Sequence, residues 1–141
     1  MKRQKKDDAP NCIISEKKNN VSLSAHQLGQ RGEKLARRYL SCRRYQIIDH
    51  NFRTKVGEID LIAIENNDLV FIEVKIRKNL SFGFPEEAVT KRKINTIKKI
   101  GQYYIQIHPQ LPQSLRLDVL AIYPKKDNSP QWQFHLFKNV S

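Results

Sequence analysis

The chain has 141 residues, with 26 Lys and Arg against 14 Asp and Glu, and a formal net charge of +12. This length suits one domain whose core needs neither disulfides nor structural metal. So basic a chain indicates a polyanionic partner, with nucleic acid ahead of a membrane surface. The absence of any apolar run of about 18 residues excludes a transmembrane helix. The N-terminus lacks the apolar segment of a secretory signal. We expect a cytoplasmic protein in which Cys12 and Cys42 are reduced.

Residues 1–22 are polar and charged without periodicity, which is typical of a disordered basic arm. Residues 23–141 would then form a single folded domain. The arm would attract phosphate only weakly, and a solvated tail is the commoner meaning of such a charge run.

A helix is predicted over residues 24–43. Ser24 followed by Gln27 matches a capping box, and apolar residues recur at helical spacing after it. Gly29 and Gly32 lower helix propensity, but they allow close approach to another backbone or to a sheet.

Glu33 falls at the edge of the apolar side of this helix, at about 100° per residue. An acid at that edge can point toward the sheet that the helix covers. A boundary residue that pairs with Arg37 accounts for the same position, and by itself the position favours this second interpretation.

A strand is predicted over residues 45–53, and residues 57–77 predict two more strands joined by a tight turn at Asn66-Asn67. Asn tolerates the positive φ of such a turn. Opposed residues then have numbers that sum to 133, so Asp60 faces Glu73 and Glu58 faces Lys75.

Two opposed carboxylates repel each other, and a bound divalent cation would offset that repulsion. A salt-bridge ladder on an exposed sheet explains the same spacing about equally well. Strand alternation, however, puts this charged group on one face with four apolar residues that are costly to expose: Ile62, Ile64, Leu69 and Phe71. The opposite face is expected to be apolar throughout, with Ile59, Leu61, Ala63, Val70, Ile72, Val74 and Ile76. The charged group would therefore lie at the rim of a buried face.

A second, strongly basic helix is predicted to open at Pro85-Glu86-Glu87 and to end at His108-Pro109. Strands follow over residues 115–123 and 132–137. A strand, a helix and a strand in that order imply a crossover, so the fold class is α/β with a mixed sheet. Asp118 lies in the apolar fourth strand, which favours a hydrogen-bonded structural acid over a remote member of the site. Phe82 and Phe84 lie in the loop between the hairpin and the second helix. We expect them to anchor that loop on the core, in preference to stacking on a base.

This pattern of helix, three strands, helix and strand, with an aspartate and an ExK across two strands, resembles the PD-(D/E)xK nuclease superfamily. More narrowly it resembles the YraN family of small bacterial proteins, which are related to archaeal Holliday-junction resolvases. The resemblance covers about residue 23 to the end, and Ile59 replaces the superfamily's proline. The matching residues are Gly29, Gly32, Glu33, Ala36, Tyr39, Leu40, Asn51, Arg53, Gly57 to Leu61, Phe71 to Lys75, Arg77, Pro85, Glu87 to Val89, Lys93 and Leu117 to Val119.

The resemblance implies a restriction-endonuclease-like core in which a mixed sheet is flanked by helices, in the order α-β-β-β-α-β with a further C-terminal strand. Asp60 and Glu73 would ligate Mg²⁺ or Mn²⁺, with the Val74 carbonyl completing the site and Glu33 reaching the ion directly or through water. Lys75 would position or deprotonate the attacking water. Contacts with nucleic acid are expected at Arg53, Lys55, Arg77, Lys91, Arg92 and Lys93.

The leading hypothesis is therefore a Mg²⁺-dependent endonuclease that hydrolyses phosphodiester bonds in DNA, including branched or junction DNA. By analogy with resolvases we expect a homodimer, and we expect no membrane partner. The alternative is a nucleic-acid-binding protein that keeps the nuclease fold without turnover. A basic adaptor for a protein partner is a third option, which would bind DNA with little dependence on salt.

Overall fold

The computed structural model describes residues 24–77, 89–124 and 131–140. These residues form α1 (Ala25–Cys42), β1 (Gln46–Thr54), β2 (Gly57–Glu65), β3 (Asp68–Ile76), α2 (Lys91–Ile107), β4 (Leu115–Pro124) and β5 (Trp132–Phe137). The strands make one sheet in the order β1-β2-β3-β4-β5. Strands β3 and β4 are parallel and the other neighbours are antiparallel. The predicted α/β class, mixed sheet and element order are confirmed.

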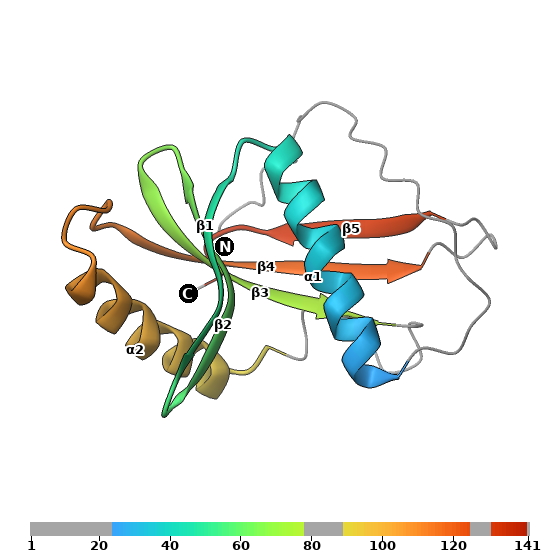
Figure 1. The fold of residues 1–141 in the computed structure, drawn as a ribbon, viewed down its shortest axis with the longest axis horizontal. Helices are drawn as coiled ribbons and strands as arrows, with labels where there is room; N and C mark the ends of the chain where they lie inside the picture. The colour runs from blue at the N-terminus through green and yellow to red at the C-terminus, as the bar shows by residue number, and fades with distance from the viewer. Residues whose placement is uncertain (1–23, 78–88, 125–130, 141) are drawn as a thin grey trace.

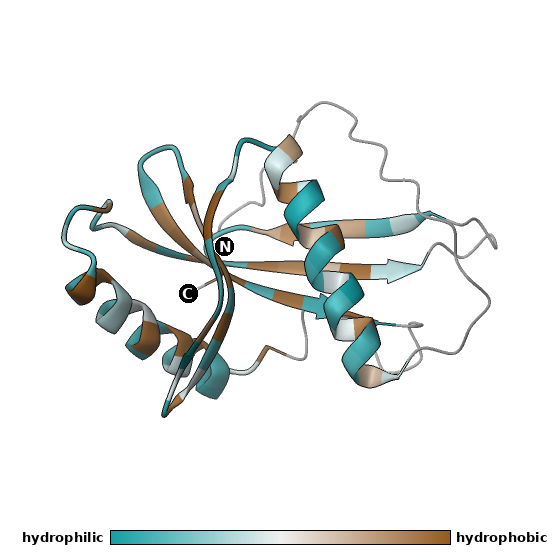
Figure 2. Ribbon diagram, in the orientation of Figure 1, coloured by the Kyte–Doolittle hydropathy of each residue, from teal (hydrophilic) through white to brown (hydrophobic). Residues whose placement is uncertain are grey.

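The two helices cover opposite faces of the sheet, with α1 across one face and α2 against the other (Figure 1). Apolar residues form buried runs in the middle of β3 and β4, while the outer side of α1 is hydrophilic (Figure 2). Each face therefore has its own core. The α1-side cluster contains Leu35, Ala36, Tyr39, Leu40, Tyr45, Leu61, Ala63, Val70, Ile72, Leu120, Ile122 and Trp132. The α2-side cluster contains Ile59, Ile62, Leu69, Phe71, Ile97, Ile100, Tyr104 and Leu117.

The capping signal of α1 is confirmed, because the Ser24 hydroxyl accepts from the Gln27 backbone N–H and the Gln27 side chain accepts from the Ser24 N–H. The predicted start of the second helix was wrong. Helix α2 begins at Lys91, where the Thr90 hydroxyl caps the Lys93 N–H and Thr90 itself is extended. The proposed opening at Pro85-Glu86-Glu87 lies outside the described residues, as do Phe82, Phe84 and the N-terminal arm.

The β2–β3 turn forms as predicted, with Asn66 and Asn67 at φ values of 48° and 64°. The register also follows the predicted sum from Glu65↔Asp68 to Leu61↔Ile72. The paired register ends there, so neither the expected pair of Asp60 with Glu73 nor that of Glu58 with Lys75 belongs to the β2–β3 ladder. Glu58 instead accepts from the Arg53 guanidinium at 3.0 Å.

A face reversal occurs where β1 and β2 pass Asn51 and Asp60. Residues two apart in a regular strand share a face, yet Ile59 belongs to the α2-side cluster and Leu61 to the α1-side cluster. Their partners on β1 are Phe52 and His50, and Asn51 between them has a φ of 50°. The expectation that Ile59 shares a face with Leu61 was therefore wrong, because strict alternation fails at this twist.

Asp118 has the structural role that the sequence favoured. It is fully buried, accepts from the Tyr45 hydroxyl at 2.8 Å and from the Asn139 N–H at 3.0 Å, and pairs with Arg116. Arg116 also contacts Glu65 and Asp68 at the turn end of the β2–β3 hairpin. Tyr45, Asn139 and Arg116 thus satisfy Asp118 within the fold, although Asp118 pairs with Ile72 in the β3–β4 register, next to Glu73.

The structure describes one of the two cysteines and both helices that could be tested for membrane crossing. Cys42 is disulfide-bonded, so the expectation of reduced thiols was wrong, and the other cysteine, Cys12, lies outside the described residues. Neither described helix combines the length and apolar character needed to cross a bilayer.

The two glycines of α1 have different surroundings. A Cβ added at Gly32 would lie 2.9 Å from Ile76 Cγ2 and 3.0 Å from Ile76 Cβ, whereas a Cβ at Gly29 would meet nothing within 4 Å. Close approach of helix to sheet is therefore confirmed at Gly32 and absent at Gly29.

We predict that Gly29→Ala raises the free energy of unfolding by about 0.5–1 kcal/mol, because it removes a flexible residue from an open helix position. Gly32→Ala should lower it by about 1–2 kcal/mol, because the overlap with Ile76 outweighs the gain in helix propensity. Urea unfolding of both variants beside the parent protein measures this difference. Equal stability of the two variants would show that α1 does not pack on β3 as described.

Candidate active site

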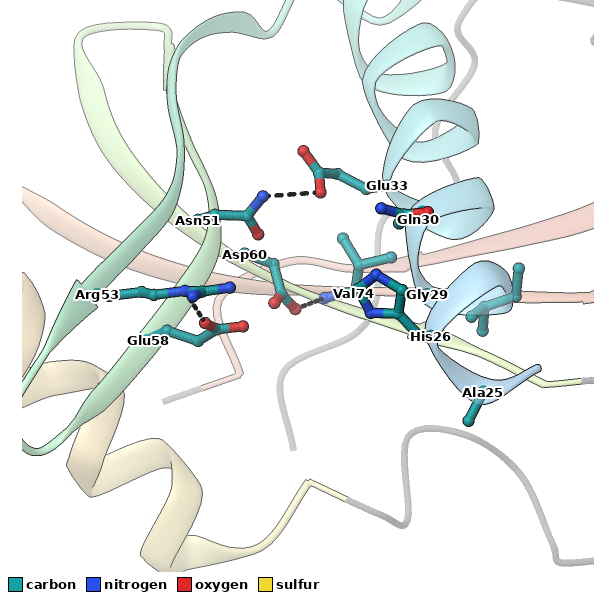
Figure 3. A pocket seen from close by; sticks show the side chains of 11 residues that line it. Ala25, His26, Gly29, Gln30, Glu33, Asn51, Arg53, Glu58, Asp60 and Val74 are labelled. Carbon is teal, nitrogen blue, oxygen red and sulfur yellow. Dashed lines mark hydrogen bonds and ion pairs between the residues drawn. The ribbon is translucent and has the colours of Figure 1, made fainter.

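The centre of the site is the point where β2 and β3 stop pairing. The last paired residues are Leu61 and Ile72, and the next residues are Asp60 and Glu73. The Val74 backbone N–H donates to Asp60 Oδ2 at 2.8 Å, as Figure 3 shows. A side-chain oxygen thus replaces the missing backbone acceptor, and the two carboxylates come together in the gap.

Glu73 is the more buried of the two acids, with 4% of its surface exposed. Its Oε1 lies 3.4 Å from the ammonium of Lys75 and 3.7 Å from that of Lys93. Its Oε2 is buried and has no hydrogen-bond partner within the described residues. A buried carboxylate oxygen without a donor is costly, so this atom has the capacity to accept a cation or a proton.

The pKa of Asp60 is raised from an ordinary value of 3.8 to about 7. Burial is the largest cause of this rise, and the negative charge of Glu73 is the second. The hydrogen bond from the Val74 N–H acts against them, and the charge of Glu58 adds to the rise. Ionised carboxylates only accept hydrogen bonds, so Asp60 and Glu73 can share one only when one of them is protonated. The pair therefore holds either a proton or, in its place, another positive charge.

We predict that the metal-free protein loses stability as the pH rises from about 4 to about 7. In that window the folded protein holds a proton on Asp60 that the unfolded chain, with a pKa near 3.8, has released. Asp60→Asn removes this term, so its stability relative to the parent should increase by a few kcal/mol across the window. Urea unfolding at several pH values with a chelator checks this. Parallel profiles for the two proteins would contradict the raised pKa.

Glu33 reaches the site from α1 and is held by three side chains. Arg37 Nη2 lies 2.8 Å from Glu33 Oε1, Asn51 Nδ2 donates to Oε2 at 2.9 Å, and His50 Nδ1 lies 3.3 Å from Oε1. The ion pair with Arg37 is therefore real, and Glu33 also points toward the sheet. Both interpretations of the sequence hold at once, and no contact between Glu33 and Glu73 is present in the described part of the chain.

A cavity of about 410 Å³ opens between the N-terminal half of α1 and strands β1, β2 and β3. The side chains of Glu33, Asn51, Glu58 and Asp60 converge on it in Figure 3. The Asp60 side chain therefore points toward α1 (Figure 3), whereas strict strand alternation predicted that it shares a face with Ile62. The complete lining is Ala25, His26, Gly29, Gln30, Glu33, Asn51, Arg53, Glu58, Asp60, Val74 and Ile76.

The residues expected to contact nucleic acid lie in three places. Arg53 has an exposed side chain paired with Glu58, and Lys55 lies in the β1–β2 turn. Lys91, Arg92 and Lys93 form the first turn of α2, and only Lys93 of these reaches Glu73. Arg77 follows β3, where its backbone N–H donates to the Ile122 carbonyl at 2.9 Å.

Sequence reasoning missed three residues of the site. The sequence assigned no role in the site to His26, His50 or Asn51, yet His26 and Asn51 line the cavity and His50 contacts Glu33. Asn in the middle of a strand was the available signal, because Asn is unusual there and tolerates positive φ. Nothing in the spacing of the histidines indicated their place.

The donors for a metal ion are fewer than in a dedicated metal site. Within residues 24–77, 89–124 and 131–140, no group of three or more His, Cys, Asp or Glu side chains is arranged to hold an ion. Mg²⁺ nevertheless binds through one or two carboxylates with waters and substrate phosphate oxygens. The orphaned Glu73 Oε2 and the raised pKa of Asp60 fit such an ion.

Comparison with known proteins supplies the family. The model of "Uncharacterised protein family UPF0102" matches residues 32–122. The chain is 39% identical over 118 residues to a UPF0102 protein of Caldicellulosiruptor saccharolyticus, covering 84% of this chain and 99% of the relative. It is 43% identical over 96 residues to one of Syntrophomonas wolfei, covering 68% and 84%. For UPF0102 protein THEYE_A1950 of Thermodesulfovibrio yellowstonii the identity is 46% over 101 residues, covering 71% and 88%.

The matched span runs from Gly32 in α1 through β4, so it includes Glu33, Asp60, Glu73 and Lys75. The resemblance to the YraN family, stated from those residues, is confirmed, because UPF0102 is that family. The chain belongs to the UPF0102 family.

Proposed function

We propose that this protein is a Mg²⁺-dependent endonuclease that hydrolyses phosphodiester bonds in DNA. The observation that carries the proposal is the convergence of Asp60 and Glu73 where β2 and β3 separate, with the Lys75 ammonium 3.4 Å from Glu73. Paired carboxylates beside a lysine are the groups that metal-assisted hydrolysis requires. The resemblance to PD-(D/E)xK nucleases supports the same reaction class.

Asp60, Glu73 and the Val74 carbonyl would hold the ion, and Glu33 would reach it through water. When bound, Mg²⁺ supplies Lewis-acid polarisation of the phosphodiester. The protein's own residues do the remaining work. Lys75 Nζ orients the attacking water and balances charge that develops on the phosphate oxygens. Lys93 shares Glu73 Oε1 with Lys75, so a substrate phosphate can attract either ammonium group away from the carboxylate.

The net charge of +12 supports DNA as the substrate, since a basic surface attracts phosphates over a distance set by ionic strength. The basic first turn of α2 adjoins the site through Lys93. Lys91 and Arg92 precede Lys93 and are suited to hold the backbone on either side of the cleaved bond.

A second candidate is a nucleic-acid-binding protein with this fold and no turnover. It is favoured by the absence of a three-residue metal group in the described residues. Both candidates predict salt-dependent DNA affinity, which a protein adaptor would lack. Metal binding separates them, because the binding protein needs no ion.

Branched or junction DNA as substrate and a homodimeric assembly rest on the family resemblance. Two strands of a duplex must be cut by two sites, which a symmetric pair provides. Sedimentation with and without four-way junction DNA tests the assembly, and unchanged monomer in both would exclude it.

We predict cleavage of a four-way junction, a flap, single-stranded DNA or plasmid in Mg²⁺ or Mn²⁺. Asp60→Asn should abolish it, and Lys75→Met should slow it on the order of 10²-fold or more, because the water loses its orienting group. Lys98→Met on α2 is the matched control, with weaker DNA binding and the same single-turnover rate at saturation. Cleavage that survives Asp60→Asn, or its absence with every substrate, would overturn the endonuclease.

We also predict that calorimetric titration with Mg²⁺ gives heat that Asp60→Asn removes. Lys93→Met should tighten Mg²⁺ binding by up to about tenfold, because one ammonium group no longer competes for Glu73. Lys91→Met, two residues away in the same helical turn, should leave the affinity unchanged. Identical affinities for the Lys93 and Lys91 variants would show that Lys93 does not share Glu73 in solution, and no heat in the parent protein would favour the binding protein.

A further inference from the structure

The cavity beside Asp60 has a shape and a charge that the cleavage reaction alone does not explain. It encloses about 410 Å³, within the range of pockets that take small molecules. Asp60 lines it from β2, and Glu33 and Gly29 line it from α1 (Figure 3). Paired duplex DNA is too wide to enter a space of this volume. One nucleotide unit at most can occupy it.

The charges of the lining select which part of a nucleotide enters. Three carboxylates face the cavity, namely Glu33, Glu58 and Asp60, and Arg53 is already paired with Glu58. Glu33 and Glu58 each already engage an arginine, so a second phosphate would find little net attraction there. A neutral base needs no such attraction, and the Gln30 amide and the Asn51 Oδ1 offer polar groups for its edge. The His26 imidazole offers a ring for stacking.

We propose that this cavity receives the base of one unpaired nucleotide of the DNA strand whose backbone lies at Asp60 and Glu73. The inference rests on the proposed function and narrows its substrate class to DNA with an unpaired or displaced nucleotide next to the cleaved bond. A base that is already unpaired enters without the free energy of unpairing, so such DNA binds more tightly than paired DNA of the same sequence.

Gly29 provides a test that leaves the acids and lysines untouched. It lines the cavity, and an added Cβ meets nothing within 4 Å, so a larger side chain can extend into the space without displacing the protein. Gly29→Leu fills the cavity, and Gly29→Ala is the matched control that changes helix propensity but adds only one methyl group. Circular dichroism and urea unfolding confirm that both variants fold.

The experiment measures binding of the full chain by fluorescence anisotropy in Ca²⁺ at about 0.1 M salt, a concentration at which surface attraction is partly screened. The probes are a duplex with one unpaired nucleotide, the same duplex fully paired, and the same duplex with an abasic site in place of the unpaired base. The parent protein and Gly29→Ala should prefer the unpaired nucleotide by about tenfold or more over the other two probes. Gly29→Leu should lose this preference and keep its affinity for the paired duplex.

Equal affinity of the parent protein for the three probes overturns the inference, as does a preference that Gly29→Leu retains. Preference for the abasic probe equal to that for the unpaired base also overturns it, because flexible backbone would then be recognised and not a base. Binding in Ca²⁺ does not require turnover, so a protein that binds selectively and never cleaves supports the cavity assignment while the endonuclease fails. Cleavage without selectivity gives the opposite result.

Discussion

The hydrogen bond from the Val74 N–H to Asp60 Oδ2 is the interaction on which the site depends. A sheet normally satisfies each buried backbone N–H with a carbonyl of the next strand. At Val74 that carbonyl is missing because the β2–β3 pairs end at Leu61 and Ile72. The Asp60 carboxylate takes its place, which fixes the carboxylate at the gap and lets the strands separate without leaving a buried donor unsatisfied. The hairpin therefore opens where the acids lie.

Opening the hairpin in this way concentrates negative charge in a partly buried place. Glu73 is almost fully buried, and two lysines from different elements approach one of its oxygens, one from β3 and one from α2. These distances of 3.4 Å and 3.7 Å exceed those of a direct charge-assisted hydrogen bond. The lysines compensate the charge of Glu73 without blocking the site, and among the described residues none donates to its other oxygen. The raised pKa of Asp60 has the same origin, because burial and the nearby charge of Glu73 both disfavour a second ionised carboxylate.

The parts of the fold that depend on local chemistry could be predicted from the sequence. Asn66 and Asn67 set the turn, and the turn set the register as far as Leu61, because each step of the ladder follows from the one before. The capping box at Ser24 is equally local. What failed depends on tertiary context. The strands reverse their faces at Asn51, and the contact of Lys93 with Glu73 requires knowing where α2 packs and that it begins at Lys91. The periodic pattern of apolar residues in the sequence indicates neither the face reversal nor the position of α2.

The face reversal links the two helices to one site. Without it, strict alternation would turn Asp60 toward α2, on the same side as Ile62 and Glu73. With it, Asp60 opens toward α1 and meets the space that Glu33 and Asn51 share, while Glu73 keeps its contact with Lys93 of α2. The gap between the strands thus joins an acidic cavity on one face to a basic helix terminus on the other. In a chain of net charge +12, Asp60 and Glu73 are thus partly or almost fully buried, where their charges affect one another most because water screens them least.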